Sequence, residues 1–171
     1  MREYGRVIAV VGIQLAILAA VPARQVRARL GGTEITLRTA PVDPMDVLAG
    51  HYVTLSYEIE RDSSDHVQSG VSPGDEVWLT VAHGDPAWTL VSVTRERPAP
   101  ASGRVSLRAR WLRWGRAVVE GAGRLYVSEE QGAAVDARRT RGGDLVDLRV
   151  GEDGTPAVVR LRGPGIDLPA E

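Results

Sequence analysis

Hydrophobic and polar residues alternate along most of the chain after residue 24, a pattern typical of strands with one buried face. The clearest run is His51–Glu60. After His51, one of its faces carries large apolar residues, namely Val53, Leu55, Tyr57 and Ile59. The other face is mostly polar, and we expect it to meet solvent. The pattern therefore predicts a strand here, followed by a polar surface loop over residues 61–74.

The same alternation predicts strands in several further segments. They are Gln25–Leu30, Thr33–Thr39, Glu76–His83, Ala87–Thr94, Arg104–Trp111, Arg116–Glu120, Arg124–Val127, Leu145–Val150 and Ala157–Arg162. Short turns join the third to the fourth and the eighth to the ninth, which predicts two β-hairpins. Two short helices are predicted, over Met45–Ala49 and from Ser128 to about Arg139. The fold is therefore expected to be mainly β, an antiparallel barrel or sandwich, with a fraying tail after Arg162.

The stretch Val7–Val21 differs from the rest because its only polar residue is Gln14. As a helix it would extend about 22 Å, which is shorter than the roughly 30 Å hydrocarbon core of a bilayer. Extension to Tyr4 and Ala23 would bring it nearer to spanning length. An uncleaved membrane anchor, a cleaved signal peptide and a buried core helix are the three interpretations of this stretch.

Positive charge lies on the N-terminal side of the apolar stretch, at Arg2 and Arg6. The positive-inside rule then leaves the N-terminus in the cytoplasm and exports everything that follows. We therefore expect residues 1–23 to form a membrane anchor or signal segment. Residues 24–171 are expected to form an extracytoplasmic β-rich domain. The expected location is the cytoplasmic (inner) membrane, crossed once.

The composition excludes several kinds of chemistry. Among its 171 residues the chain has no cysteine and no lysine. Disulfides, thiolate nucleophiles, Schiff bases and Ser-Lys dyads are therefore ruled out. The formal charge of −1 gives no overall attraction to nucleic acid, so no nucleic-acid partner is expected.

The segment Gly50–Tyr57 reads Gly-His-Tyr-Val-Thr-Leu-Ser-Tyr and resembles the signature of the GDYXXLXY family. Leu37–Pro44 resembles the lead-in of that family, and Gly123–Gly132 resembles its later segment. The resemblance implies a bacterial membrane-anchored protein without an established activity. His51 stands where the signature has Asp. This departure favours a structural role for the position over acid–base chemistry or metal binding.

The sequence predicts no catalytic residue, metal or cofactor. The three histidines, His51, His66 and His83, lack the i, i+4 spacing of a helical zinc site. Glu58 and Glu60 share a face of one predicted strand, where two carboxylates do not lie across a substrate as they do in glycosidases. We therefore favour a protein that is not an enzyme.

Residues suited to binding are predicted in two places. The signature segment supplies polar and aromatic side chains, and the strand Arg104–Trp111 supplies a row of arginines suited to anionic headgroups or an acidic partner. A tryptophan just after that strand suits contact with a bilayer or a partner. The candidate binding residues are His51, Tyr52, Tyr57, Glu58, Arg104, Arg108, Arg110 and Trp114.

These observations predict a membrane-anchored extracytoplasmic domain that binds an envelope or membrane-protein partner. The membrane itself is an expected partner, through the N-terminal helix. The alternative is a cell-envelope hydrolase or carbohydrate-binding domain. That alternative needs a deep cleft with convergent polar groups near His51–Glu60, whereas a flat or convex sheet there favours the binding domain.

Overall fold

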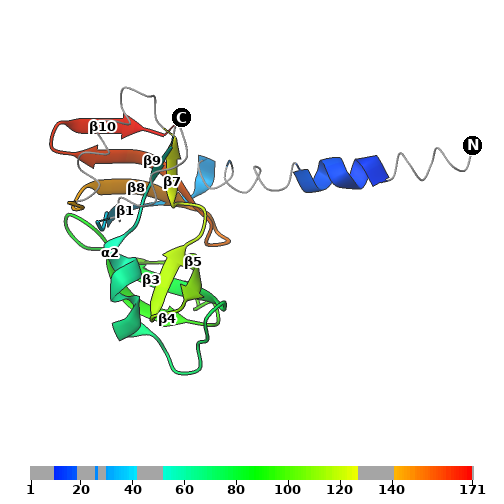
Figure 1. The fold of residues 1–171 in the computed structure, drawn as a ribbon, viewed down its shortest axis with the longest axis horizontal. Coiled ribbons are helices and arrows are strands. Elements are labelled where there is room, and N and C mark those ends of the chain that lie inside the picture. The colour runs from blue at the N-terminus through cyan, green and yellow to red at the C-terminus, as the bar shows by residue number, and fades with distance from the viewer. Residues whose placement is uncertain (1–9, 19–25, 27–29, 42–51, 127–140, 171) are drawn as a thin grey trace, which may run out of the picture.

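The computed structural model describes residues 10–18, 26, 30–41, 52–126 and 141–170. Within these ranges ten strands form three antiparallel sheets (Figure 1). The prediction of a mainly β, antiparallel fold is confirmed at this level. The two helices predicted over Met45–Ala49 and Ser128–Arg139 fall outside the described residues.

The first sheet has four strands in the order β1-β8-β9-β10. Their bounds are β1 Thr33–Arg38, β8 Leu145–Val150, β9 Pro156–Gly163 and β10 Ile166–Pro169. The predicted hairpin over β8 and β9 is confirmed. The tail does not fray after Arg162, because Leu168 pairs with Leu161 of β9 and, like Ile166, packs against the core.

The second sheet has four strands in the order β4-β3-β5-β6 and lies below the first in Figure 1. Their bounds are β3 Glu76–Ala82, β4 Thr89–Thr94, β5 Arg104–Leu112 and β6 Arg116–Val119. The predicted β3-β4 hairpin is confirmed, with Leu79 opposite Val93. The inward residues Leu107, Ala109 and Trp111 of β5 are buried, as their alternation predicts.

A short ribbon of β2 (Tyr52–Thr54) and β7 (Arg124–Tyr126) forms the third sheet. After β2 the chain forms a helical turn, α2 (Glu58–Arg61), and a 3₁₀ helix, η2 (Asp62–His66). The strand predicted over His51–Glu60 is therefore wrong after Thr54, and the loop prediction is wrong at η2. Glu60 is buried, although it falls on the face expected to meet solvent, so the segment is not a strand with one polar face.

One hydrophobic cluster takes side chains from all three sheets. Large residues that are almost fully buried in it are Ile35, Leu37, Leu79, Leu107, Leu125, Leu148 and Leu161. The apolar residues of the signature segment join the same cluster, namely Val53, Leu55, Tyr57 and Ile59. The signature segment is therefore part of the core on which the β domain depends.

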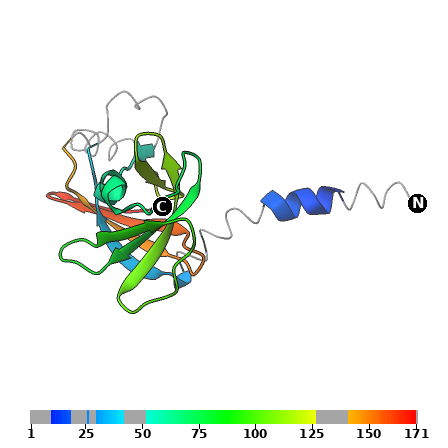
Figure 2. The same ribbon diagram turned by 90° about the horizontal axis from the view of Figure 1, so that it is seen from below.

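Residues 10–18 are helical and stand clear of the sheets in both ribbon views (Figures 1 and 2). This helix contributes nothing to the core cluster, which argues against the buried-helix interpretation. No helix in the described ranges is long and apolar enough to cross a bilayer. Val26 and Leu30 are also helical, so the strand predicted over Gln25–Leu30 is wrong at these two residues. Val26 and Leu30 are exposed, so they lack the buried face that the prediction assumed.

Candidate functional site

The signature segment enters the domain as one strand of the β2-β7 ribbon. Val53 pairs with Leu125, and the N–H of Leu55 donates to the carbonyl of Gly123 at 2.9 Å, which extends the pairing beyond β2. Val53, Leu55 and Leu125 are all buried. The first half of the signature therefore joins two strands and fills the core.

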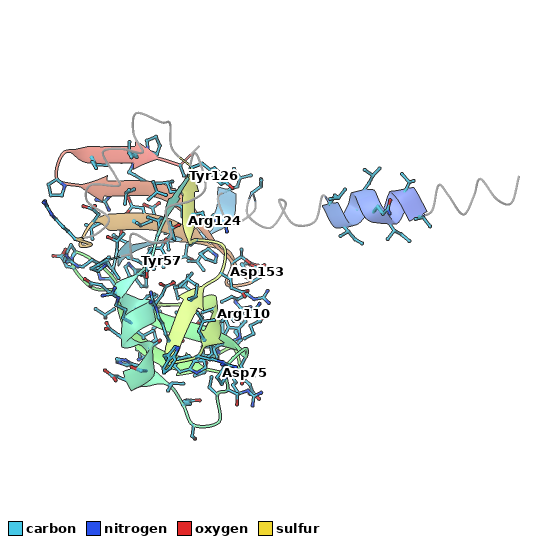
Figure 3. The ribbon with its side chains drawn as sticks, viewed as in Figure 1. Tyr57, Asp75, Arg110, Arg124, Tyr126 and Asp153 are labelled. Carbon is cyan, nitrogen blue, oxygen red and sulfur yellow. The ribbon has the colours of Figure 1, made fainter. Side chains whose placement is uncertain are left out.

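Tyr57, a predicted binding residue, lies in the interior of the β domain, where Figure 3 labels it. Its hydroxyl donates to the carbonyl of Ala122 at 2.7 Å, and its backbone forms a bridge with Thr39, directly after β1. Burial, and next the nearby Glu60 carboxylate, raise the pKa of the Tyr57 phenol well above its usual value. The phenol therefore stays protonated and acts as a buried hydrogen-bond donor.

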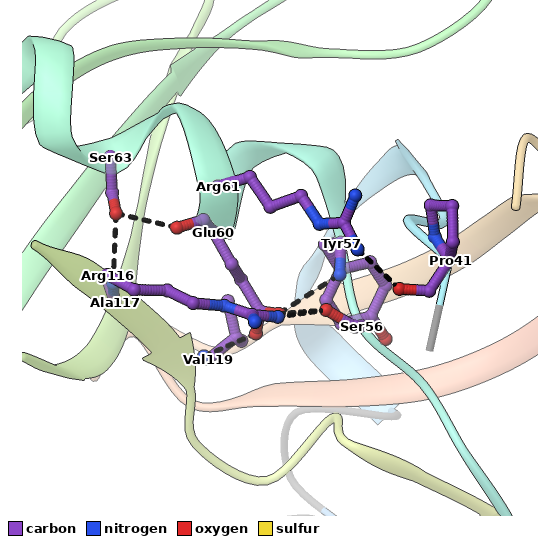
Figure 4. A network of polar contacts seen from close by, with 9 residues as sticks. All are labelled: Pro41, Ser56, Tyr57, Glu60, Arg61, Ser63, Arg116, Ala117 and Val119. Carbon is purple, nitrogen blue, oxygen red and sulfur yellow. Dashed lines mark hydrogen bonds and ion pairs between the residues drawn. The ribbon is translucent and has the colours of Figure 1, made fainter. Parts of the chain in front are cut away.

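The Glu60 carboxylate is the centre of a buried polar network (Figure 4). One oxygen, Oε1, accepts the N–H of Val119 at 2.8 Å. The other, Oε2, accepts the Ser56 hydroxyl at 2.9 Å and the N–H of Tyr57 at 3.1 Å. The bond to Tyr57 is the N3-to-N-cap half of a capping box at the start of α2. Arg116 lies 3.8 Å from Oε2 and donates to the Ser56 hydroxyl at 2.7 Å.

Ser63 of η2 completes the contact with the edge strand β6. Its hydroxyl accepts the N–H of Ala117 at 2.9 Å and donates to the carbonyl of Glu60 at 2.6 Å. Ala117 and Val119 are alternate residues of β6, so their N–H groups point to the same side of the strand. The side chains of Glu60 and Ser63 thus accept hydrogen bonds from the free edge of β6, in the place of the backbone carbonyls of a further strand. The segment after the signature closes this edge of the second sheet.

Burial is the largest influence on the Glu60 carboxyl and raises its pKa. Hydrogen bonds from Val119, Tyr57 and Ser56, and the charge of Arg116, oppose that rise. The folded protein therefore binds a proton on Glu60 more tightly than the unfolded chain does. By linkage, the contribution of Glu60 to stability is fully present below its ordinary pKa of 4.5 and declines as pH rises through the raised value.

Replacing Glu60 with Gln removes this titration. We expect the difference in unfolding free energy, wild type minus Glu60→Gln, to decrease as pH rises from about 4 to about 8. Guanidinium denaturation of both proteins at a series of pH values measures this difference. A difference that grows with pH over this range would show that hydrogen bonding, rather than burial, dominates at Glu60.

The predicted arginines of β5 share a face but meet different surroundings. Arg108 lies 2.7 Å from the Glu76 carboxylate and Arg110 lies 2.5 Å from Glu120, so both charges are paired. The hydrogen bond to Glu76 is the largest influence on the Arg108 guanidinium and raises its pKa. Within the described ranges, Arg104 has no carboxylate at ion-pair distance. The row predicted as one cationic patch therefore keeps an unpaired charge only at its Arg104 end.

Trp114 is 97% exposed in the turn between β5 and β6. Its φ of 72° places it in the left-handed region, which a bulky side chain adopts at a cost of about 1–2 kcal/mol. The neighbouring Leu112 is also exposed. Trp114 therefore exposes a large aromatic side chain to solvent while its backbone adopts a left-handed conformation that is unfavourable for a bulky residue.

The remaining predicted binding residues belong to the signature segment. His51 lies outside the described residues, and for Tyr52 only its place in β2 is described. Glu58 is half exposed and lies 3.6 Å from the Arg38 guanidinium. Sequence reasoning missed Glu60, Ser63 and Arg116 as a cluster, although Glu60 three residues after Tyr57 carries the spacing of a capping box.

The described residues line a groove and a larger cavity. A groove of about 610 Å³ lies beside the signature ribbon and includes Leu55, Val119, Glu120 and Tyr126 in its lining. A larger cavity of about 810 Å³ is lined by residues of both four-stranded sheets. The described lining of each contains one carboxylate, Glu120 or Glu152, so the described residues assemble no carboxylate pair across a substrate. No cluster of three metal-ligating side chains occurs in the described part of the chain.

One of the comparisons with known proteins identifies a family for this chain. A family model described as GDYXXLXY protein matches residues 14–161, which contain the signature and strands β1 to β8. No curated protein and no solved structure matches the chain. Because the matched region covers most of the sequence and includes Gly50–Tyr57, this protein belongs to the GDYXXLXY family.

Proposed function

We propose that this protein is a membrane-anchored domain on the outer side of the cytoplasmic membrane that docks onto an envelope or membrane-protein partner. In this proposal the domain binds its partner without catalysing a reaction. The two four-stranded sheets sharing one core support a sandwich rather than a closed barrel as its scaffold.

The observation that carries the proposal is the exposure of the N-terminal helix. Its large apolar side chains are between 46% and 71% exposed: Val10, Val11, Ile13, Leu15, Ile17 and Leu18. A helix that is apolar on all sides needs an apolar environment all round. The β domain does not provide one, whereas a bilayer does. The full run Val7–Val21 and its arginine flank suit that placement.

Trp114 supports docking by the exported domain. Exposed tryptophans are enriched among the residues that contribute most to protein–protein binding. Leu112 and Arg113 directly precede it, so the turn presents two apolar side chains beside a cation. An intramolecular role does not account for a side chain that is 97% exposed. We therefore place the partner contact at the β5-β6 turn.

Flotation with phospholipid vesicles tests the anchor. The full chain is expected to float, and the double variant Ile13→Arg/Ile17→Arg is expected to stay in the aqueous fraction, because two arginines in the helix strongly disfavour insertion. The double variant Ser69→Arg/Ser102→Arg adds the same charge at exposed turns of the β domain and should float like the wild type. Equal flotation of all three chains would contradict an anchor in this helix.

Replacing Trp114 with Asn separates docking from stability. Asn tolerates a left-handed backbone better than Trp, so unfolding free energy should stay the same or rise by up to about 1 kcal/mol. A photo-crosslinker at Arg113 should capture one membrane protein in native membranes, and Trp114→Asn should abolish that capture.

A crosslinker at Ser69, in a different exposed turn, serves as the position control for this capture. Capture that is the same from Ser69, or that survives in Trp114→Asn, would contradict docking at the β5-β6 turn. Loss of stability in Trp114→Asn would instead assign Trp114 a structural role.

A further inference from the structure

We propose that the cavity of about 810 Å³ is a binding site for the headgroup of an anionic phospholipid, with a phosphate between two arginines and headgroup hydroxyls against a row of protein hydroxyls. The inference rests on the proposed membrane anchor, which brings the domain close to lipid. The volume falls within the range typical of small-molecule sites.

The floor of the cavity is a row of hydroxyls across three adjacent strands. Thr80 of β3 lies opposite Ser92 of β4 and opposite Ser106 of β5, and all three line the cavity. The hydroxyls of Thr80 and Ser106 lie 3.4 Å apart. Side chains opposite one another in a sheet point to the same face, so the three hydroxyls present donors and acceptors side by side. This arrangement suits a ligand that carries several hydroxyl groups.

Two arginines line the same cavity, Arg97 and Arg104. The Arg97 guanidinium donates to the carbonyl of Glu152 and lies 5.2 Å from the centre of the Trp78 ring. Those contacts hold its position without neutralising its charge, since neither partner is a carboxylate. Arg104 has no carboxylate at ion-pair distance in the described ranges.

Other arginines of the domain contrast with these two. Eight of them lie within 3.8 Å of a carboxylate oxygen: Arg38, Arg95, Arg108, Arg110, Arg116, Arg149, Arg160 and Arg162. Among the described residues that line the cavity there is one carboxylate, Glu152, against two guanidinium groups, so this part of the lining is net positive. Arginine binds phosphate oxygens through two parallel hydrogen bonds, which makes phosphate the anion that this pair suits best.

The position of the cavity along the chain favours a lipid as the source of that phosphate. Gly31 and Thr33, the first residues of the β domain, line it. Residues 24–30 separate them from the end of the expected anchor, and this length of chain spans at most about 25 Å when fully extended. The cavity is therefore tethered within reach of the lipid headgroups, which raises their effective concentration at the site.

Native mass spectrometry of the full chain in mild detergent tests the site, with phosphatidylglycerol and phosphatidylcholine as the probes. We expect wild type to retain phosphatidylglycerol in preference to phosphatidylcholine. The double variant Arg97→Gln/Arg104→Gln should lose at least about tenfold in phosphatidylglycerol affinity, since it removes two charge-assisted phosphate contacts. The double variant Arg110→Gln/Arg160→Gln removes the same charge outside the cavity and should stay within about twofold of wild type.

The outcomes separate this inference from the proposed anchor. Flotation of wild type and of both arginine double variants, without any arginine-dependent lipid preference, would overturn the headgroup site and leave the anchor standing. Arginine-dependent binding of phosphatidylglycerol by a chain that does not float would support the site and contradict the anchor. Equal affinity for glycerol 3-phosphate in solution would overturn the lipid assignment in favour of a free phosphorylated polyol.

Discussion

The variant Glu60→Ala is expected to unfold with a free energy about 3–5 kcal/mol lower than wild type. The substitution leaves the N–H groups of Val119 and Tyr57 buried without an acceptor. Each unsatisfied buried group costs about 1–3 kcal/mol. It also removes the carboxylate beside Arg116, whose Nε is buried without a partner in the described structure.

Glu58→Ala is the matched control, because it removes a second glutamate from the same helical turn. Glu58 is half exposed and its pair with Arg38 spans 3.6 Å, so the expected loss is at most about 1 kcal/mol. Chemical denaturation of the full chain in mild detergent measures both. Similar losses in the two variants would mean that the Glu60 network does not hold α2 against β6.

The second large effect is expected for Gly154→Ala, in the turn between β8 and β9. Gly154 is buried with φ of 79°, and an added Cβ would overlap the ring of Trp78 and lie 3.1 Å from the carbonyl of Ser106. Overpacking costs about 1–3 kcal/mol and the left-handed backbone a further 1–2, so we expect a loss of about 2–5 kcal/mol.

Gly165→Ala separates the two contributions. Gly165 has nearly the same φ, 78°, but an added Cβ would meet no atom within 4 Å. Its variant should lose only the backbone cost of about 1–2 kcal/mol. Thermal or chemical denaturation of both variants gives the comparison. Equal losses at Gly154 and Gly165 would contradict tight packing of the β8-β9 turn on Trp78.

The alternation of apolar and polar residues correctly predicts strands whose apolar side chains face the core. The strands β3, β4, β5, β8 and β9 lie close to their predicted bounds, because each turns apolar residues of its alternating pattern into the core. Pairing between β1 and β8, which are more than a hundred residues apart, has no counterpart in the local pattern. Sheet order depends on such long-range contacts, and the sequence alone does not specify them.

The signature segment shows where alternation misleads. Val53, Leu55, Tyr57 and Ile59 are buried as predicted, yet only the first lies in a strand. The deciding residue is Glu60, which turns inward because the edge of β6 offers an N–H donor at Val119. A buried carboxylate of this kind depends on a partner 59 residues away, so local propensity does not reveal it.

For the candidate binding residues, the sequence pattern indicates the side chains but does not reveal their partners. The alternation of Arg104–Trp111 singles out the arginine row, and the position just after that strand singles out Trp114. The structure has Trp114 and Arg104 at the surface. The pairing of Arg108 with Glu76, and of Arg110 with Glu120, depends on strand register, which alternation does not provide. The hydroxyl row beside Arg104 has the same origin, because it arises only when β3, β4 and β5 align.

The membrane placement can be measured directly because the chain contains no cysteine. Single cysteines are introduced by Ser69→Cys, in the β domain, and by Glu3→Cys, before the apolar run. A membrane-impermeant maleimide is then added to intact spheroplasts. The account predicts that Ser69→Cys is labelled in the membrane fraction at once, and that Glu3→Cys is labelled only after lysis. Labelling of Ser69→Cys only after lysis, or loss of the Glu3 cysteine from the mature chain, would contradict it.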